Sequence, residues 1–297
     1  MKKICSFNFQ CFQKFQLFKT FFLLAIFILM NSCASNKFEF IDAGGGQHET
    51  TLYKNVARHD FRKDDFISYG SRMIYAGSDG KYVSRQGIDI SHHDGQIDWQ
   101  KVKAWGVDFV ILRVGYMGYK SGKLKIDTRF HHNVKEALAA GLEVGVYIFA
   151  QAINEAEALE EARFVLREIK DYKISLPVVY DPESIPWDTA RTDGVSKKQF
   201  TENARTFCEA IRDAGYTPMI YMNMMWQAFH LDLEELNEFD FWYADYEKIP
   251  QTPYRFTFWQ YSCMGLVDGI NVPSKKNCLV DMNIWLVKND GLKQAAD

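Results

Sequence analysis

From residue 86 onward, short apolar runs alternate with amphipathic stretches. Eight of the runs are rich in Val, Ile, Phe and Tyr and have the length of buried strands. These predicted strands are residues 87–91, 109–114, 144–149, 177–180, 218–221, 241–246, 257–261 and 280–284. Helical patterns cover residues 128–140, 155–172 and 197–214, and Gly141 and Gly215 follow two of them, where a left-handed cap is needed. Strands that alternate with helices predict a parallel sheet with right-handed crossovers.

The number of strands favours a closed barrel. The last three strands are separated by too little sequence for full helices. We therefore expect an α/β fold, an irregular (β/α) barrel of eight strands and about five helices that resembles a TIM barrel. A doubly wound open sheet is the structural alternative. We place this domain at residues 85–290, followed by a C-terminal tail at 291–297.

The N-terminus has the pattern of an export signal. Lys2 and Lys3 precede an unbroken apolar run at 21–30, which is too short for a transmembrane helix of about 20 residues. Residues 1–32 are therefore predicted to be a secretory signal. Cys33 stands where a bacterial lipoprotein signal has its lipidated cysteine, which predicts a membrane-anchored lipoprotein of the cell envelope. A signal cleaved without lipidation and an uncleaved anchor are the alternatives.

Residues 33–84 contain three consecutive glycines and show no clear periodicity, which predicts a tether or N-terminal extension. The formal net charge is −3, without the basic signature of a nucleic-acid binder. Export permits a disulfide, and Cys263 and Cys278 are the nearest pair. There is no CxxC motif, Gly-rich phosphate loop or Gly-x-Ser-x-Gly motif, so we expect no zinc cluster, nucleotide chemistry or serine-esterase chemistry, and no cofactor. His92 and His93 are adjacent and face opposite ways on a strand, which argues against a shared metal ion.

Acidic residues stand where four predicted strands end: Asp89, Asp181 with Glu183, Asp245, and Asp281. Barrel enzymes carry their catalytic groups at the carboxyl ends of strands. Asp181 and Glu183 are two residues apart and should face the same side, with backbones roughly 6–7 Å apart. Crowded carboxylates cannot all ionise freely, so one should hold a proton near neutral pH, as a general acid does. The alternative is that each acid caps a helix or lies in solvent.

Five sequence blocks resemble glycoside hydrolase family 25, a family of lysozymes. The blocks are DISHHDGQIDW from Asp89, Asp181-x-Glu183, WYADY at 242–246, WQYS at 259–262 and VDMN at 280–283. The resemblance implies the irregular barrel and hydrolysis of the β-1,4 bond between N-acetylmuramic acid and N-acetylglucosamine in peptidoglycan. One departure is Ile148, which follows Tyr147 where many relatives have His. The implied partners are peptidoglycan glycan strands and, through the lipid, a membrane; we expect a monomer.

The resemblance also implies roles for the acids. Glu183 would be the general acid, and Asp181 would orient the substrate's acetamido group or stabilise the oxocarbenium-like charge. Asp89 and Asp281 would complete an acidic floor. Retention with the acetamido oxygen as nucleophile is the implied outcome, although an i, i+2 pair also fits the separation of an inverting site.

Further polar and aromatic residues near the strand ends are candidates for substrate binding. They are Tyr147, Tyr221, Trp242, Asp245, Gln260 and Arg113. Core packing is the alternative for the aromatic residues, and a solvated strand end is the alternative for Asp245. Gln260 could bind a sugar hydroxyl or brace Asp281. Arg113 could contact the lactyl carboxylate of muramic acid, neutralise an acidic neighbour, or form a structural ion pair. Asp98 and Trp99 are expected to cap and pack the first helical stretch.

Two other functions remain open at this point. One is a glycosidase that acts on another N-acetylated glycan. The other is a non-catalytic glycan-binding lipoprotein, against which the Asp181-x-Glu183 pair argues, because a pure binder needs no acid there.

Overall fold

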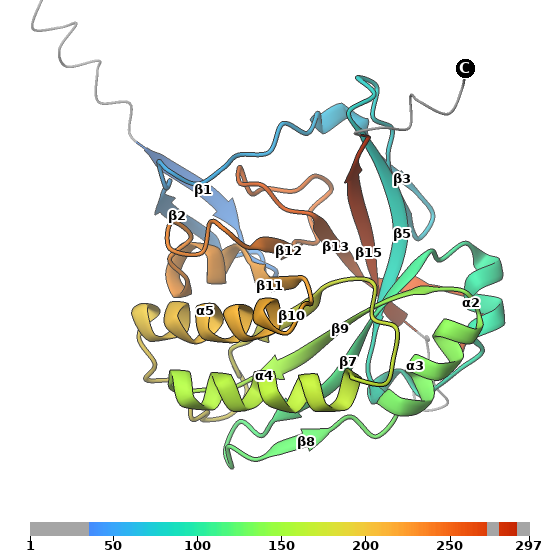
Figure 1. Ribbon diagram of the computed structural model, residues 1–297. Coiled ribbons are helices and arrows are strands. Elements are labelled where there is room, and N and C mark those ends of the chain that lie inside the picture. The colour runs from blue at the N-terminus through green and yellow to red at the C-terminus, as the bar shows by residue number, and fades with distance from the viewer. Residues whose placement is uncertain (1–35, 272–278, 290–297) are drawn as a thin grey trace, which may run out of the picture. The chain divides into compact units, whose positions relative to one another are not determined.

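The computed structural model describes residues 36–271 and 279–289 (Figure 1). The chain divides into two compact units, and of the described residues only 36–39 and 49–52 belong to the small one. Most of β1 (Lys37–Ile41) and β2 (Gln47–Thr51), which form a two-stranded sheet, lies in that unit. The expected signal at 1–32 and the lipidated Cys33 lie outside the described residues. None of the helices in the described part of the chain combines the length and apolar character needed to cross a membrane.

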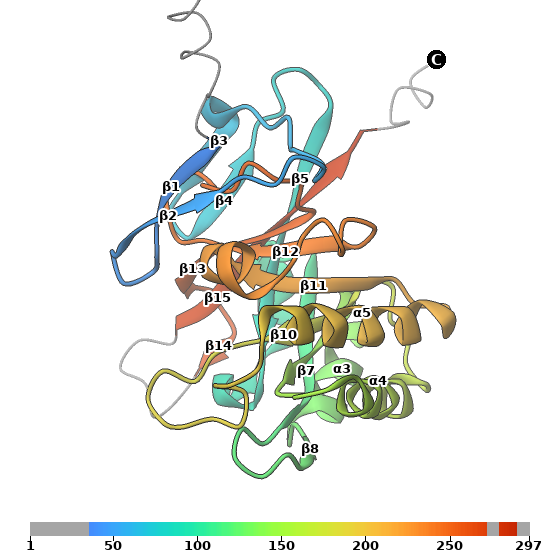
Figure 2. The ribbon, with the colours of Figure 1, turned by 90° about the vertical axis from the view of Figure 1, so that its left-hand side faces the viewer.

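The large unit is built around one closed sheet. Its strands are β5 (Tyr82–Ile90), β7 (Phe109–Met117), β8 (Leu124–Ile126), β9 (Glu143–Ala150), β10 (Val178–Pro182), β11 (Pro218–Asn223), β12 (Asp240–Ala244), β13 (Phe258–Leu266) and β15 (Leu279–Lys288). Their order is β5-β15-β13-β12-β11-β10-β9-β7-β8, and β5 also pairs with β7 (Figures 1 and 2). Eight strands therefore close a barrel, and β8 extends it at β7. This confirms the predicted α/β barrel of eight strands.

One barrel strand runs against the others. The pairs from β5 through β7, β9, β10, β11 and β12 to β13 are parallel, whereas β15 is antiparallel to both β13 and β5. A parallel neighbour needs a crossover of a dozen or more residues, usually a helix, and the described part of the connection from β13 to β15, residues 267–271, contains no helix. Within that connection, β14 (Ile270–Asn271) pairs with β6 (Gln96–Ile97). The sheet is therefore mixed, where the sequence predicted a parallel one.

Helices cover the outside of the parallel strands (Figures 1 and 2). They are α2 (Trp99–Trp105), α3 (Phe130–Ala139), α4 (Glu155–Ile169) and α5 (Lys197–Asp213), with the π-helical turn η3 (Trp226–His230) and the 3-10 turns η1 (Lys63–Asp65) and η2 (His92–Asp94). Asp98 accepts a hydrogen bond from the backbone N–H of Lys101 and caps α2 as predicted. Gly141 and Gly215 have φ values of 76° and 88°, the left-handed geometry predicted after α3 and α5.

The barrel interior is filled by side chains from alternate positions of the strands. The buried cluster consists of Phe109, Ile111, Leu176, Val179, Met219, Tyr221, Trp242, Ala244 and Phe258, with Tyr147 and Trp285 packed against it. Gly87 is required by this packing, because a Cβ atom there would lie 2.2 Å from Cζ of Phe109. In β12, Trp242 and Ala244 point inward, so the residues between and after them face outward.

Part of the predicted tether is folded. Residues 66–75 form a hairpin of β3 (Phe66–Tyr69) and β4 (Arg72–Tyr75). Phe66 lies edge-on to Trp259 of the barrel, with ring centroids 5.1 Å apart. Phe61, which also belongs to the predicted tether, packs on the barrel side with its ring centroid 5.1 Å from that of Phe256. The sequence pattern missed these strands because they are only four residues long and their apolar contacts are made with distant parts of the chain.

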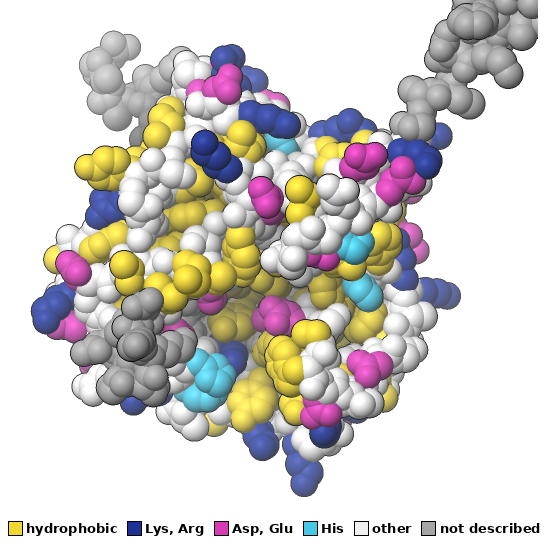
Figure 3. Space-filling view, turned by 180° about the vertical axis from the view of Figure 1, so that it is seen from behind, with side chains coloured by type: hydrophobic (Ala, Val, Ile, Leu, Met, Phe, Trp, Pro, Cys, Tyr) yellow, Lys and Arg dark blue, Asp and Glu magenta, His cyan; other side chains and the backbone are white. Residues whose placement is uncertain are grey.

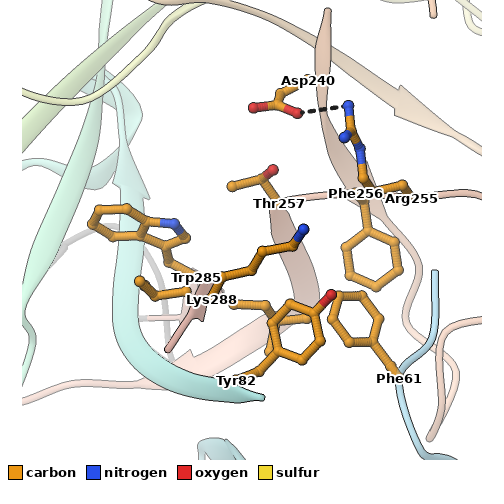
Figure 4. A pocket seen from close by; sticks show the side chains of 10 residues that line it. Phe61, Tyr82, Asp240, Arg255, Phe256, Thr257, Trp285 and Lys288 are labelled. Carbon is orange, nitrogen blue, oxygen red and sulfur yellow. Dashed lines mark ion pairs between the residues drawn. The ribbon is translucent and has the colours of Figure 1, made fainter. Parts of the chain in front are cut away.

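A pocket of about 280 Å³ lies near the amino ends of β12 and β13, next to the end of β15. Phe61, Tyr82, Trp285 and Phe256 surround it, and Asp240 and Arg255 form an ion pair at its edge with an N–O distance of 3.4 Å (Figure 4). It is separate from the acidic residues predicted to be functional, which stand at the carboxyl ends of the strands.

Candidate active site

The four predicted catalytic acids come from three strands that end or begin at the same end of the barrel. Asp89 is the second-last residue of β5, Asp181 is the second-last of β10, and Glu183 follows β10 by one residue. Asp281 is the third residue of β15 and pairs in register with Asp89. Because β15 is antiparallel, its beginning lies beside the carboxyl ends of the other strands. Residues directly opposite on antiparallel strands share a face of the sheet, so Asp281 and Asp89 are neighbours.

Asp89 is the centre of a buried hydrogen-bond network. Its Oδ2 accepts one bond from Nε2 of Gln260 at 2.9 Å and one from Nδ2 of Asn283 at 2.8 Å. Oδ1 of Asn283 accepts in turn from Nε1 of Trp242 at 2.8 Å. Asn283 is fully buried and Trp242 is 2% exposed. Trp242 therefore supports the site from within the barrel, which agrees with the packing alternative given for it.

Gln260 is held by two tyrosines. Its Oε1 accepts hydrogen bonds from the hydroxyls of Tyr221 at 3.0 Å and Tyr246 at 3.1 Å. The sequence suggested that Gln260 binds a sugar hydroxyl or braces Asp281. In the structure its amide donates to Asp89, and its role in binding sugar stays a prediction. Tyr147 is half-buried and its ring lies 6.0 Å from that of Trp242. Of these aromatic residues, Tyr147 and Tyr246 keep the most solvent access.

The acids of the site have raised pKa values that differ from one another. Burial raises the pKa of Asp89 to about 6, against the hydrogen bonds from Asn283 and Gln260, which favour its ionised form. Burial also raises the pKa of Glu183 to about 7, where the negative charge of Asp89 adds to the effect and the charge of Arg113 opposes it. Asp181 has a pKa well above its usual range because it is buried and lies near the charges of Glu183 and Asp89. These shared influences place Asp89, Asp181 and Glu183 in one electrostatic cluster.

Asp181 and Glu183 differ in access. Asp181 is 5% exposed, and its buried Oδ1 has no hydrogen-bond partner among residues 36–271 and 279–289. Glu183 is partly exposed. An unpartnered buried oxygen is costly unless it is protonated or meets a ligand. The pair therefore combines an inner carboxyl that lacks a partner with an outer one that a ligand can reach.

Arg113 forms a structural ion pair. Its Nε and Nη2 lie 2.9 and 2.8 Å from Oδ2 of Asp127, which is 2% exposed. Nη2 also lies 2.5 Å from Nδ1 of His92 in the turn η2. The guanidinium is thus held beside the site, where its charge lowers the pKa of both Asp181 and Glu183. The sequence pattern did not identify Asp127, because it follows an edge strand outside the family blocks.

Asp245 faces away from the barrel interior and organises a loop. Its Oδ2 accepts from the hydroxyl of Tyr243 at 2.7 Å and from the backbone N–H of Gln251 at 2.8 Å. Its Oδ1 accepts from the backbone N–H of Glu247 at 3.1 Å. Asp245 is also buried, so it is not a solvated strand end. These contacts give Asp245, the residue after β12, a structural role, and its role in binding substrate stays a prediction.

No three His, Cys, Asp or Glu side chains within the described ranges are arranged to hold a metal ion. Cys208 is buried and Cys263 is exposed, and Cys278, the predicted partner of Cys263, lies outside the described residues.

Seen from behind, the molecule has a hollow lined by hydrophobic side chains with Asp or Glu side chains beside it (Figure 3).

A barrel that gathers buried carboxyl groups at the carboxyl ends of its strands, one of them with a pKa near neutrality, has the arrangement of a glycoside hydrolase. The chain belongs to glycosyl hydrolases family 25, whose sequence profile matches residues 88–270. The chain is 30% identical over 235 residues to lysozyme M1 of Streptomyces globisporus, which covers 71% of this chain and 76% of that protein.

Two solved structures support the same assignment. The modular autolysin LytC of Streptococcus pneumoniae matches with a TM-score of 0.59 and 26% identity, over 84% of this chain and 57% of LytC. LytC has also been solved in complex with a synthetic peptidoglycan ligand. The bacterial lysozyme of Streptomyces coelicolor matches with a TM-score of 0.52 and 25% identity, over 67% of this chain and 90% of that chain.

Proposed function

We propose that this protein is an N-acetylmuramidase that cleaves the β-1,4 bond between N-acetylmuramic acid and N-acetylglucosamine in peptidoglycan. The observation that carries the proposal is the gathering of Asp89, Asp181 and the partly exposed Glu183 at one end of the barrel, where burial raises the pKa of Glu183 to about 7. Such a group holds a proton at neutral pH and can pass it to a leaving sugar oxygen. Lysozyme M1, and LytC with its peptidoglycan ligand, support peptidoglycan as the substrate.

In the proposed reaction, the acetamido oxygen of the muramic acid residue attacks its own anomeric carbon. The bond from that carbon to the glycosidic oxygen breaks, and Glu183 gives its proton to this oxygen. Water then attacks the anomeric carbon and breaks its bond to the acetamido oxygen, while Glu183 takes one proton from this water. The two displacements together retain the configuration. The unpartnered Oδ1 of Asp181 supports a role in accepting the acetamido N–H, which would favour the ionised form of Asp181 and make the acetamido oxygen more nucleophilic.

Asp89, Asp281 and Cys33 also have roles in the proposed function. Asp89, whose pKa of about 6 is lower than that of Glu183, would be the ionised group that stabilises positive charge at the anomeric carbon. Asp281 would close the acidic floor opposite Asp89. We further propose that Cys33 carries a lipid that holds the enzyme at a membrane of the cell envelope, near its substrate.

Glu183→Gln tests the function, because it keeps the shape of the side chain and removes the transferable proton. We expect the release of new reducing ends from purified peptidoglycan to fall by about 100-fold or more, the range that a general acid contributes. Glu160→Gln, at an exposed residue of α4, is the matched control and should leave the rate unchanged. Circular dichroism checks that both variants are folded.

Three results would contradict the proposal. Glu183→Gln with wild-type activity would remove Glu183 from its role. New reducing ends of N-acetylglucosamine, in place of muramic acid, would make the enzyme a glucosaminidase. A wild-type protein that binds peptidoglycan and never cleaves it would be a binding protein.

A further inference from the structure

The backbone at Glu183 lies just beyond the reach of the barrel's strand pairing. The β9–β10 ladder ends with the pair Ala150–Pro182, and the β10–β11 ladder ends with Tyr180–Ile220. Glu183 is the next residue, and a loop follows it up to α5. A group that must be held within a fraction of an ångström therefore stands at the first position without a ladder partner.

Gln151, the residue after Ala150, forms hydrogen bonds to the backbone and side chains that follow the end of the ladder. Its Nε2 donates to the backbone carbonyl of Glu183 at 2.8 Å. Its Oε1 accepts from Oγ1 of Thr192 at 3.1 Å, near the other end of the same loop. Gln151 is 1% exposed, so water does not compete for these bonds. One side-chain amide thus joins both ends of the segment 183–192 to the end of β9.

The main chain of Gln151 is fixed as well. Its N–H donates to Oε1 of the buried Glu161 at 2.9 Å, and its carbonyl accepts from Nη1 of Arg191 at 2.9 Å. Arg191 is itself in a bidentate ion pair with Glu157, at 2.6 and 2.7 Å. All four polar groups of Gln151 therefore have partners, and three of these partners, Glu183, Arg191 and Thr192, belong to the loop that Glu183 begins.

We propose that Gln151 is a positioning residue, which holds the Glu183 backbone so that its carboxyl group lies at the glycosidic oxygen of the substrate. The inference rests on the proposed function of Glu183. Gln151 need not touch substrate. Its contribution is geometric, and a displacement of about 1 Å at a catalytic group can cost about 100-fold in rate.

Gln151→Leu tests this role by removing both amide bonds with little change in volume. We expect kcat on soluble peptidoglycan fragments to fall at least about tenfold, with KM within about twofold of the wild-type value. The matched control is Asn203→Leu. Asn203 is also a fully buried amide and donates to the carbonyl of Ala152 at 2.8 Å, one residue further along, without a contact to Glu183. Equal losses of kcat in the two variants, or none in Gln151→Leu, would overturn the proposal.

Gln151→Glu provides a second variant and a readout that a general loss of stability would not move. When its carboxyl group is protonated, the O–H can donate to the carbonyl of Glu183, and when ionised it cannot. The ratio of the kcat of Gln151→Glu to that of Gln151→Leu should therefore rise as the pH falls. A ratio that stays constant from pH 5 to 8 would contradict the role of the donated hydrogen bond.

Hydrogen exchange separates this inference from the proposed function, because it does not require activity. Backbone amides of residues 183–193 should exchange at least about tenfold faster in Gln151→Leu than in the wild type, and at the wild-type rate in Asn203→Leu. Unchanged exchange in Gln151→Leu refutes the positioning role whatever the enzyme cleaves. Faster exchange in a chain whose wild type has no muramidase activity would leave the loop contact in place and remove the proposed function.

Discussion

Glu161 is a buried acid that contacts the backbone of Gln151, and its loss of a proton should lower the stability of the protein as the pH rises from about 4.5 to about 8. It lies on α4, is fully buried, and accepts the backbone N–H of Gln151 at Oε1. Its Oε2 has no partner among the described residues. Burial raises the pKa of Glu161 from 4.5 to about 8, with a further contribution from the charge of Glu157 and an opposing one from Arg191.

The sign and size of the effect follow from proton linkage. Between pH 4.5 and about 8 the folded protein keeps this proton and the unfolded chain releases it. The unfolded state therefore binds fewer protons, and the free energy of unfolding falls as the pH rises through this window. At about 1.4 kcal/mol per pKa unit, the raised pKa of Glu161 lowers the free energy of unfolding by about 1 kcal/mol at pH 5 and by about 4 kcal/mol at pH 8.

Glu161→Gln mimics the protonated acid and removes this pH dependence. Urea unfolding of both proteins at pH 5, 6, 7 and 8 measures the difference in unfolding free energy. We expect the advantage of the variant over the wild type to grow by about 3 kcal/mol from pH 5 to pH 8. Glu160→Gln, at the exposed neighbour of Glu161, should show a constant difference. The reasoning is refuted if the difference for Glu161→Gln is also independent of pH.

Two further predictions concern activity and location. The kcat/KM for peptidoglycan should follow a narrow bell in pH, because Asp89 loses its charge below its pKa of about 6 and Glu183 loses its proton above its pKa of about 7; a rate that is flat from pH 4 to 9 would contradict these roles. Replacing Cys33 by Ala should abolish incorporation of a labelled fatty acid and move the protein from the membrane fraction to the soluble fraction, and a protein that still carries the label would show that another residue is modified.

Much of the fold and the site was predictable from local patterns. The eight strand runs, the caps at Asp98, Gly141 and Gly215, and the spacing of Asp181 and Glu183 are properties of neighbouring residues. Hydrophobic alternation and turn chemistry act over a few residues, so a single sequence displays them directly. The position of the acids at strand ends was readable for the same reason.

The partners of these acids were decided by the tertiary structure. Asp89 meets Gln260 and Asn283 across sequence separations of 171 and 194 residues, because barrel closure places β15 between β5 and β13. In the sequence Asp245 follows a strand in the same way as the other acids. In the structure its side chain lies on the outer side of the barrel and accepts a hydrogen bond from Tyr243. Local alternation fixes which residues share a face, whereas only the closed barrel fixes which face is inside. That choice also set the burial that raises the pKa of Glu183.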